Sequence, residues 1–281
     1  MKMKCEKVER KITVVNDCAY VMSDLLPYLS DFNIDIILRS RGFWAKTFGL
    51  LWKISQINSC SLIHVNYALQ DAFLVCKLKH LDILECHGTD MRETLNTRKY
   101  GWIVKSALKR ARRVLYSTPD LENSVKTFRP DATILPTPVR KEFLDQKVEW
   151  IEKLRAVAFQ LGYEEFPAEL YRYCQLYNIE LQVAERNIPY QDMPSFLSSY
   201  NIFIDRMTIP SFSKTCLEAM GAGLATVDHR HANTLLDRIS ELADPTKAMQ
   251  VGKENKQNVK TEHHVETVAE KLRKIYCEEL E

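Results

Sequence analysis

The sequence lacks any run of about 18 apolar residues, the length that a helix needs to cross a bilayer, so no transmembrane helix is expected. Its first ten residues, Met1 to Arg10, are rich in charge and contain no apolar stretch like that of a secretory signal peptide. No Cys-x-x-Cys pair occurs among the eight cysteines, and there are no internal repeats or low-complexity tracts. These absences predict a cytoplasmic chain with reduced, mostly buried thiols.

An excess of charge of one sign is also missing, because 39 basic and 37 acidic residues leave a net charge of only +2. The molecule as a whole is therefore not expected to bind a polyanion. The distribution is uneven, however, since seven basic residues and no acidic residue lie between Arg98 and Arg113. Hydrophobic residues make up 46% of the chain, which is enough for a packed core.

Short apolar runs alternate with helical patterns along the chain. These runs are rich in Val, Ile and Leu and are bounded by Asn, Asp, Pro or Gly, which predicts buried strands. The predicted strands are 12–15, 34–38, 62–65, 83–86, 114–117, 133–135, 156–159, 179–183, 202–205 and 224–227. Apolar strands separated by helices indicate parallel sheets covered on both faces, and so a doubly wound α/β fold.

The Pro-rich segment 135–139 interrupts this alternation, because proline donates no hydrogen bond to a sheet and restricts the residue before it. We interpret it as a hinge between an N-terminal domain, residues 1–138, and a trimmed C-terminal domain, residues 139–281. Helices are predicted at 167–177, 193–200 and 213–222, and a terminal amphipathic helix at 262–279 is expected to pack back on the N-terminal domain. In such folds ligands bind in a cleft beyond the carboxyl ends of the strands.

The most informative segment is 205–227, where a predicted strand, a polar loop, a helix and a second strand follow one another. The first N–H groups of the helix have no partner within it, and its dipole favours negative charge there. Ser213 and Thr215 add hydroxyl groups and Lys214 adds a cation, so the helix start predicts a phosphate or diphosphate site. The carboxylate of Glu218, one turn further on, can accept hydrogen bonds from a ribose diol.

A surface N-cap followed by an ordinary amphipathic helix is the plainer interpretation of this segment. The combination Leu-Glu-Ala-Met-x-x-Gly at 217–223, followed by a strand, is less generic. It resembles the signature of family-4 glycosyltransferases, which are two-domain enzymes of the GT-B type. Further segments resemble elements of that family in the same order along the chain. They are the His-Gly-Thr-Asp loop at 86–92, the strand and Ser-Thr element at 114–121, the linker entry at 134–139 and the turn at 188–194.

The resemblance implies two Rossmann-like domains with parallel sheets facing a central cleft. It also implies transfer of a sugar from a nucleotide-diphospho-sugar to an acceptor hydroxyl, with retention of configuration and without a metal or other cofactor. In this family Glu218 would bind the ribose of the donor, and the segment 212–215, which begins with Phe212, would hold its diphosphate. The acceptor would be a carbohydrate, a lipid-linked group or another hydroxyl compound.

The sequence departs from the family at two donor contacts. Pro210 stands where relatives carry a Glu, and the usual Gly-Arg-Leu-x-x-x-Lys-Gly turn is absent near 155–162. Lys214, with Arg206 or Arg92, would then have to bind the phosphates. The contact to the donor sugar would pass to Asp205.

The resemblance and the strand ends also indicate candidate residues in the N-terminal domain. His87, Asp90 and Arg92 form the predicted catalytic group. His87 alternatively caps a loop, Asp90 is alternatively a helix N-cap, and Arg92 alternatively makes a surface ion pair. Asn16 and Asp17 end the first strand, where an acceptor would approach.

The basic segment 98–113 separates into two faces at helical period. One face carries Arg98, Trp102, Lys105, Lys109 and Arg112, and the other is apolar. A cationic stripe with a Trp suits an anionic membrane surface or a lipid-diphosphate acceptor, on the inner face of the membrane. The alternative is the solvated face of a scaffold helix. No nucleic-acid partner is expected, because nothing in the sequence resembles a base-reading module.

The predicted function is therefore a glycosyltransferase of the hexosyltransferase type. A phosphorylase or epimerase on a similar fold is an alternative, as is a degenerate GT-B-like domain that binds a glycan or a partner protein. Four histidines, His229, His231, His263 and His264, are expected on the surface rather than in a metal site, because no carboxylate or Cys stands at ligand spacing.

Overall fold

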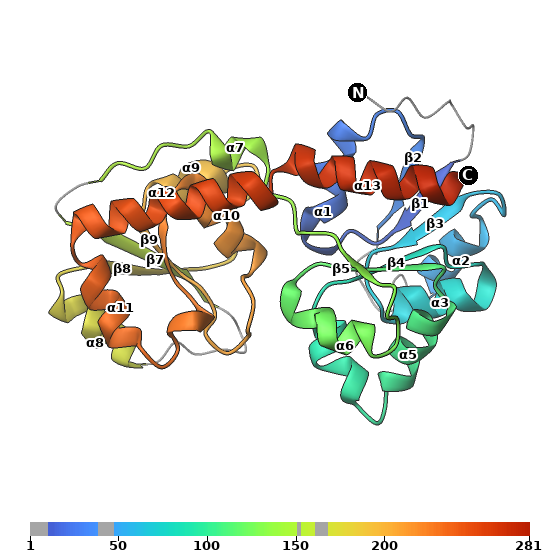
Figure 1. Ribbon diagram of the computed structural model, residues 1–281, viewed down its shortest axis with the longest axis horizontal. Helices are drawn as coiled ribbons and strands as arrows, with labels where there is room; N and C mark the ends of the chain where they lie inside the picture. Colours follow the sequence, from blue (N-terminus) through green and yellow to red (C-terminus); the bar gives the residue numbers. More distant parts are fainter. Residues whose placement is uncertain (1–10, 39–47, 151–152, 161–167) are drawn as a thin grey trace. The chain divides into compact units, whose positions relative to one another are not determined.

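The computed structural model describes residues 11–38, 48–150, 153–160 and 168–281. They form two compact units, each built around a parallel sheet with helices packed against it (Figure 1). Unit 1 comprises the chain up to Thr137 together with Glu266–Glu281, and unit 2 runs from Pro138 to Val265. The prediction of an α/β fold with two parallel sheets is confirmed. No helix in the described ranges is long and apolar enough to span a membrane.

Unit 1 contains a six-stranded sheet in the order β2-β1-β3-β4-β5-β6, in which all neighbours are parallel. The strands are β1 (Ile12–Val15), β2 (Ile34–Ile37), β3 (Leu62–Val65), β4 (Ile83–Cys86), β5 (Arg113–Tyr116) and β6 (Thr133–Ile134). Its α-helices are α1 (Val21–Leu25), α2 (Leu50–Ser55), α3 (Gln70–Leu78), α4 (Thr89–Arg92), α5 (Gly101–Arg110), α6 (Glu122–Lys126) and α13 (Val265–Leu280).

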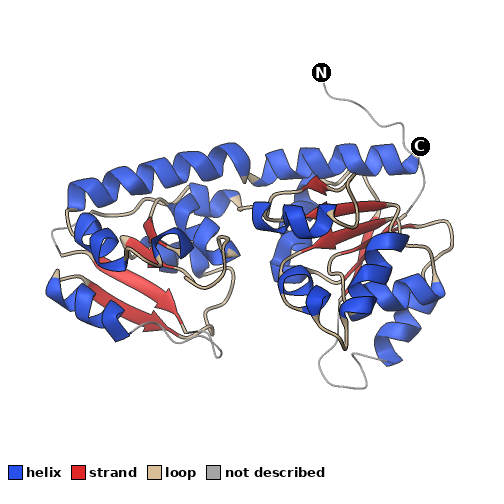
Figure 2. Ribbon diagram, turned by 60° about the horizontal axis from the view of Figure 1, so that its bottom comes forward, coloured by secondary structure: helices blue, strands red, loops and turns tan. Residues whose placement is uncertain are grey.

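The two faces of the unit 1 sheet are covered by different helices. Val65 of β3 and Leu84 of β4 share an apolar core with Val104 and Leu108 of α5 on one face. The other face carries α13, which lies along the sheet in Figure 2 and buries Tyr276 against β3. Because side chains alternate along a strand, each central strand of this sheet contributes to both layers.

Unit 2 contains a four-stranded parallel sheet in the order β10-β9-β7-β8. The strands are β7 (Arg155–Phe159), β8 (Glu180–Ala184), β9 (Ile202–Ile204) and β10 (Ala225–Val227). The helices are α7 (Lys141–Leu144), α8 (Ala168–Leu176), α9 (Met193–Ser198), α10 (Lys214–Ala222), α11 (Leu235–Leu242) and α12 (Pro245–Glu262). Phe203 of β9 belongs to the core under α9 and α10, whereas Ile202 and Ile204 belong to the core under α8 and α11. The chain leaves the carboxyl end of β9 through the loop that precedes α10.

All ten predicted strands are present, with ends within one residue of the predicted ones. The terminal helix differs, because the chain forms α12 up to Glu262 and a separate α13 from Val265, rather than one helix over 262–279. The helix α12 was not predicted, although Asp244 caps it by accepting hydrogen bonds from the N–H groups of Thr246 (2.8 Å) and Lys247 (3.4 Å). Pro245 occupies its first turn, as expected for a residue without an N–H group.

The expectation of reduced thiols throughout is wrong at one position, because Cys277 of α13 is disulfide-bonded. Six other cysteines are free, namely Cys18, Cys60, Cys76, Cys86, Cys174 and Cys216. The sequence pattern did not reveal this bond, because no Cys-x-x-Cys or similar spacing marks Cys277.

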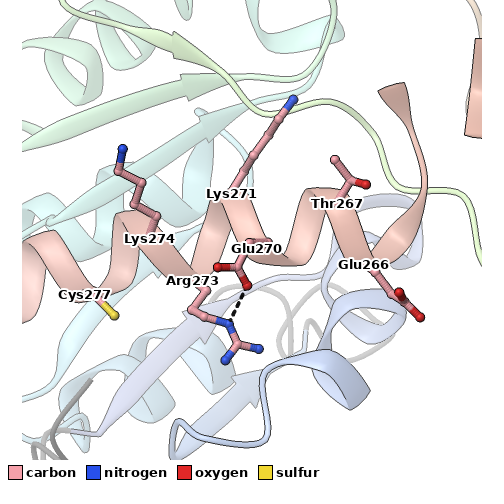
Figure 3. A pocket seen from close by; sticks show the side chains of 7 residues that line it. All are labelled: Glu266, Thr267, Glu270, Lys271, Arg273, Lys274 and Cys277. Carbon is pink, nitrogen blue, oxygen red and sulfur yellow. Dashed lines mark ion pairs between the residues drawn. The ribbon is translucent and has the colours of Figure 1, made fainter. Parts of the chain in front are cut away.

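A cavity of about 520 Å³ lies along α13. Figure 3 shows its lining side chains, which come from this helix and include Glu270 and Arg273, paired at 3.1 Å. Arg273 is further engaged by Asp31 at 2.6 Å. None of the predicted site residues lines this cavity, so the candidate site lies elsewhere.

Candidate functional site

The loop between β9 and α10 in unit 2 is shaped by Asp205 and Ser213. Asp205 is 4% exposed, and its Oδ2 accepts a hydrogen bond from the Ser213 N–H at 2.9 Å. Ser213 in turn caps α10, because its Oγ accepts from the Cys216 N–H at 3.0 Å. Asp205 therefore supports the loop and fixes the residue at which α10 begins.

A small pocket lies at the carboxyl ends of β7 and β9, beside the start of α10. It is lined by Phe159, Arg186, Phe203, Ile204, Asp205, Arg206, Ser213 and Thr215. The Arg206 Nε atom is buried and has no hydrogen-bond partner among the described residues. The pocket itself has a volume of only about 10 Å³, room for about one water molecule, and the Asp205 carboxylate is part of its lining. Two guanidinium groups, two hydroxyl groups and a helix N-terminus gather around it, and such groups favour an anion such as a phosphate beside them. Arg186, from the loop after β8, was missed in the sequence because no motif marks it.

Glu218 lies behind this pocket on α10 and is 2% exposed. Its Oε1 accepts a hydrogen bond from the Tyr190 hydroxyl at 2.8 Å and is 3.9 Å from Lys214 Nζ. The Lys214 ammonium lies 5.1 Å from the Tyr190 ring centroid, and the Arg140 guanidinium lies 4.2 Å from it. Glu218 and Lys214 were predicted as separate contacts to the ribose and the phosphates, and the structure brings them next to each other, with Tyr190 and Arg140 as partners that the sequence did not reveal.

Phe212 packs under a charged cluster at the end of β10. Its ring makes an edge contact with His229 at 5.3 Å between centroids, and the Arg230 guanidinium lies over it at 4.9 Å. Arg230 is held by two hydrogen bonds to Asp228, at 2.8 and 2.9 Å. Burial alone would raise the pKa of Asp228, but its bonds to Arg230 and His231 outweigh burial and hold the pKa well below its ordinary range.

In unit 1 the loop after β4 is organised around Asp90. Its Oδ1 accepts from the N–H groups of Gly88 (2.8 Å) and Met91 (3.0 Å), and its Oδ2 accepts from the Ala68 N–H at 3.1 Å. Asp90 is fully buried. Asp90 is not the N-cap of α4, which is Gly88, but lies in the first turn of that helix, and its oxygens are occupied by backbone donors of the surrounding loops.

Arg92 is bound within unit 1 by the element after β5. Its guanidinium donates to both carboxylate oxygens of Asp120, at 2.7 and 3.1 Å, and to Thr118 Oγ1 at 3.1 Å. Burial would raise the pKa of Asp120, but the hydrogen bonds from Arg92 and Thr118 lower it. A bidentate pair of this kind leaves Arg92 rigid and its charge largely compensated.

His87 follows β4 and lies among buried polar groups. Its Nε2 is 3.3 Å from Glu85 Oε1 and also contacts Asn66 Oδ1. Glu85 was missed, although a carboxylate inside the apolar run Ile-Leu-Glu-Cys is the kind of buried polar residue that has a specific role.

Asn16 and Asp17 lie at the carboxyl end of β1, as predicted, in a strained turn. Asn16, Ala19 and Tyr20 have φ values of 72°, 53° and 62°, where non-glycine residues are rare. Asp17 accepts hydrogen bonds from the N–H groups of Met22 (2.8 Å) and Ser23 (3.2 Å). Asp17 therefore supports the start of α1, while Asn16 stays at the strand end.

Only the middle of the basic segment forms a helix, α5 (Gly101–Arg110), so Arg98 and Arg112 of the predicted stripe lie outside it. Val104, Ala107 and Leu108 of the predicted apolar face are buried, whereas Ile103 is half-buried. Trp102 is 54% exposed, and its ring meets Phe73 of α3 edge-on at 5.2 Å. Arg98, Lys105 and Lys109, which the sequence pattern assigned to the basic face, are all exposed. Arg112 differs, because it pairs with Glu279 at 3.0 Å.

No family model matches the chain, and no curated protein matches its sequence. Solved structures do share its fold, which is that of the GT-B glycosyltransferases. Sucrose-phosphate synthase from Thermosynechococcus elongatus superposes with a TM-score of 0.66 at 14% identity, over 95% of this chain and 98% of the other. HepE of Anabaena, in complex with UDP-glucose, gives 0.68 at 11% identity, over 95% and 99%. An α-glucosyltransferase in complex with UDP-glucose and DNA containing an abasic site gives 0.62 at 9% identity, over 95% and 99%.

Proposed function

We propose that the protein is a glycosyltransferase that moves a sugar from a nucleotide-diphospho-sugar to an acceptor hydroxyl. The observation that carries this proposal is the pocket at the start of α10, where Arg186, Arg206, Ser213 and Thr215 surround a helix N-terminus. The complexes of HepE and the α-glucosyltransferase with UDP-glucose support a nucleotide-sugar as the ligand. The two arginines supply the positive charge that the family's Arg and Lys turn would otherwise provide.

In this proposal the groups around the pocket bind the diphosphate, and Glu218 binds the ribose. The helix N-terminus, Arg206 and Arg186 stabilise the charge that develops on the leaving diphosphate. Lys214 lies beside Glu218 and contributes cationic charge close to the same anion. Retention of configuration and independence of metal ions are carried over from the family-4 resemblance and belong to the proposal.

His87 is the proposed contact to the sugar in unit 1, and Asn16 is the proposed contact to the acceptor. Asp90, Arg92 and Asp17 act in this proposal by holding those residues in place, because their polar atoms bind neighbouring groups of unit 1. The acceptor is a hydroxyl compound, either a carbohydrate or a lipid-linked group at an anionic membrane surface near α5.

A degenerate domain that binds a glycan without turnover is the second candidate. It is favoured by Pro210 and by the bidentate pairing of Arg92 with Asp120. The two candidates differ in donor binding, so a nucleotide screen distinguishes them.

The experiment is a thermal-shift screen with UDP, GDP, ADP, CMP and their sugars. A nucleotide at about a hundred times its Kd adds about 2.7 kcal/mol of stability, which raises Tm by several degrees. The rise with one nucleotide should be lost in Glu218→Gln and kept in Glu241→Gln, which changes an exposed carboxylate of the same unit. A folded protein that no nucleotide stabilises would support the degenerate domain.

A further inference from the structure

Two polar side chains are buried next to each other in the centre of the unit 1 sheet. Glu85 of β4 and His64 of β3 are both 0% exposed. Leu84 and Cys86 flank Glu85, and Ile63 and Val65 flank His64. All four belong to the apolar core, so strand alternation directs Glu85 and His64 to the opposite face. Tyr276 of α13 is fully buried and lies 2.9 Å from His64 Nδ1 on that face. A carboxylate buried this deeply is stable only with charged or hydrogen-bonding partners.

Glu85 lies between two imidazole rings. Its Oε2 is 3.5 Å from His64 Nε2, and its Oε1 is 3.3 Å from His87 Nε2. Burial alone would raise the pKa of Glu85, but the charge of His87 and the hydrogen bond and charge of His64 lower it. The carboxylate is therefore ionised, and its charge is directed at both rings.

The surroundings of the rings determine which nitrogen carries a proton. His87 Nε2 faces two acceptors, Glu85 Oε1 and Asn66 Oδ1, so Nε2 must carry hydrogen. His87 Nδ1 has no hydrogen-bond partner among the residues that the structure describes. On the other side, His64 Nε2 faces the carboxylate, and its Nδ1 lies 2.9 Å from the Tyr276 hydroxyl.

We propose that Glu85 is a positioning residue that, together with Asn66, holds His87 with Nε2 protonated and with Nδ1 presented to the substrate. His64 Nε2 faces the second oxygen of Glu85 at 3.5 Å, and the Tyr276 hydroxyl holds His64 through Nδ1, so a residue of the last helix completes the array. The effect on turnover rests on the proposed glycosyltransferase function, whereas the protonation pattern of His87 does not. Glu85 itself touches no substrate in this scheme.

The protonation pattern is tested by nuclear magnetic resonance of protein labelled with ¹⁵N-histidine. We expect His87, assigned by comparison with His87→Asn, to give the signature of a ring protonated at Nε2. Glu85→Gln places an amide at the same position. The amide can present either its oxygen or its NH₂ group to the ring, so His87 should no longer be held protonated at Nε2. The control Glu279→Gln removes a buried carboxylate of α13 that pairs with Arg113 and should leave the pattern unchanged.

A second variant keeps the test decisive if Glu85→Gln does not fold. Tyr276→Phe retains the carboxylate and removes only the hydroxyl bonded to His64. It should shift the His64 ring signals, whereas Tyr116→Phe, at a buried tyrosine of β5, should not. A His87 ring protonated only at Nδ1 in the wild-type protein would overturn the proposal without any variant.

Turnover supplies the second readout, with the donor that the nucleotide screen identifies. We expect Glu85→Gln to lower kcat about tenfold to a hundredfold while the donor KM stays unchanged, because the ring is misoriented but the phosphate pocket is intact. If Glu85→Gln has the kcat of the wild type, the proposed effect of Glu85 on turnover is refuted. If the wild-type protein transfers no sugar, the proposed function fails, and the resonance experiment still decides whether Glu85 positions His87.

Discussion

The Tyr190 hydroxyl donates a hydrogen bond to Glu218 Oε1 at 2.8 Å, and so occupies an oxygen that the proposed function assigns to the ribose of the donor. Glu218 is 2% exposed, which means that it needs a partner when no nucleotide is bound. Tyr190 provides that partner. A nucleotide that uses both carboxylate oxygens would have to displace it.

Tyr190→Phe tests whether Tyr190 both stabilises Glu218 in the protein without ligand and competes with the nucleotide for its carboxylate. Removing the hydroxyl takes one hydrogen bond from Glu218 Oε1, which keeps the Lys214 ammonium at 3.9 Å, so the free energy of unfolding should fall by about 1 kcal/mol in the protein without ligand. The nucleotide no longer has to displace Tyr190, so the rise in Tm that it causes should be larger in the variant than in the wild type. Thermal shift with and without the nucleotide measures both effects. Equal rises would show that Tyr190 keeps its bond when the nucleotide binds.

Gly88 is a position where only glycine fits. Its φ is +138°, and a Cβ atom added there would collide with the Arg92 guanidinium. Gly88→Ala should lower the free energy of unfolding by about 1–3 kcal/mol through backbone strain and through loss of the bond between Arg92 and Asp120. Urea unfolding measures the change.

A double-mutant cycle isolates the steric part of that penalty. In the Arg92→Ala background the collision is absent, so Gly88→Ala should cost less than it does in the wild type. Gly223→Ala serves as the control, because Gly223 also has a positive φ, of +102°, but its added Cβ would meet only Lys256 Cδ at 3.6 Å. An unchanged cost in the Arg92→Ala background would assign the whole effect to the backbone.

The sequence predicted the strands well because each is a short apolar run bounded by polar residues or Gly, and such a run has few alternatives in a buried sheet. It did not predict that Lys214 and Glu218 pair, although residues four apart lie on one face of a helix. The helix α12 was missed even though its cap and first-turn proline, Asp244 and Pro245, are visible in the sequence. There the polar composition of the helix hid its periodicity.

The parts of the site that were missed depend on contacts between distant segments. Glu85 meets His64 only because β3 and β4 are neighbours in the sheet, and Tyr276 reaches them from a helix more than 180 residues further along the chain. Arg186 and Tyr190 come from the loop after β8 and approach α10 only in the folded unit. Local periodicity contains no information about such pairs, whereas it does determine which face of a strand or helix is buried.

The stability of unit 2 should depend on pH through Asp228. Its pKa in the folded protein lies well below the ordinary value of 3.8, so ionised Asp228 contributes stability above that value. The contribution is lost as the pH falls below about 4 toward the folded pKa. Wild-type protein should therefore lose about 1 kcal/mol more than Asp228→Asn when urea unfolding is compared between about pH 7 and pH 3, because pH 3 lies less than one unit below the ordinary pKa of 3.8. Asp237→Asn, an exposed position on α11, should follow the wild-type curve.

The exposed face of α5 leads to a final prediction, which is that the protein binds anionic membranes. Trp102 is 54% exposed beside Lys105 and Lys109, and an exposed indole among lysines is suited to the boundary between lipid headgroups and acyl chains. We expect binding to vesicles that contain anionic lipid, with a blue shift of Trp fluorescence, and no binding to neutral vesicles. Each lysine contributes about 1 kcal/mol at such a surface, so replacing both with alanine should weaken binding about thirtyfold.

Trp102→Ala should weaken vesicle binding as well, because the apolar contact is lost while the charge remains. Trp52→Ala is the matched control, since Trp52 is 66% exposed on α2 of the same unit but lies outside the basic segment. Duplex DNA is the competing ligand to test, because its phosphate backbone would also attract the lysines of this face. Salt-sensitive binding to DNA that survives Trp102→Ala, with no binding to anionic vesicles, would assign the basic face to a nucleic acid, since phosphate contacts need the lysines and not the indole.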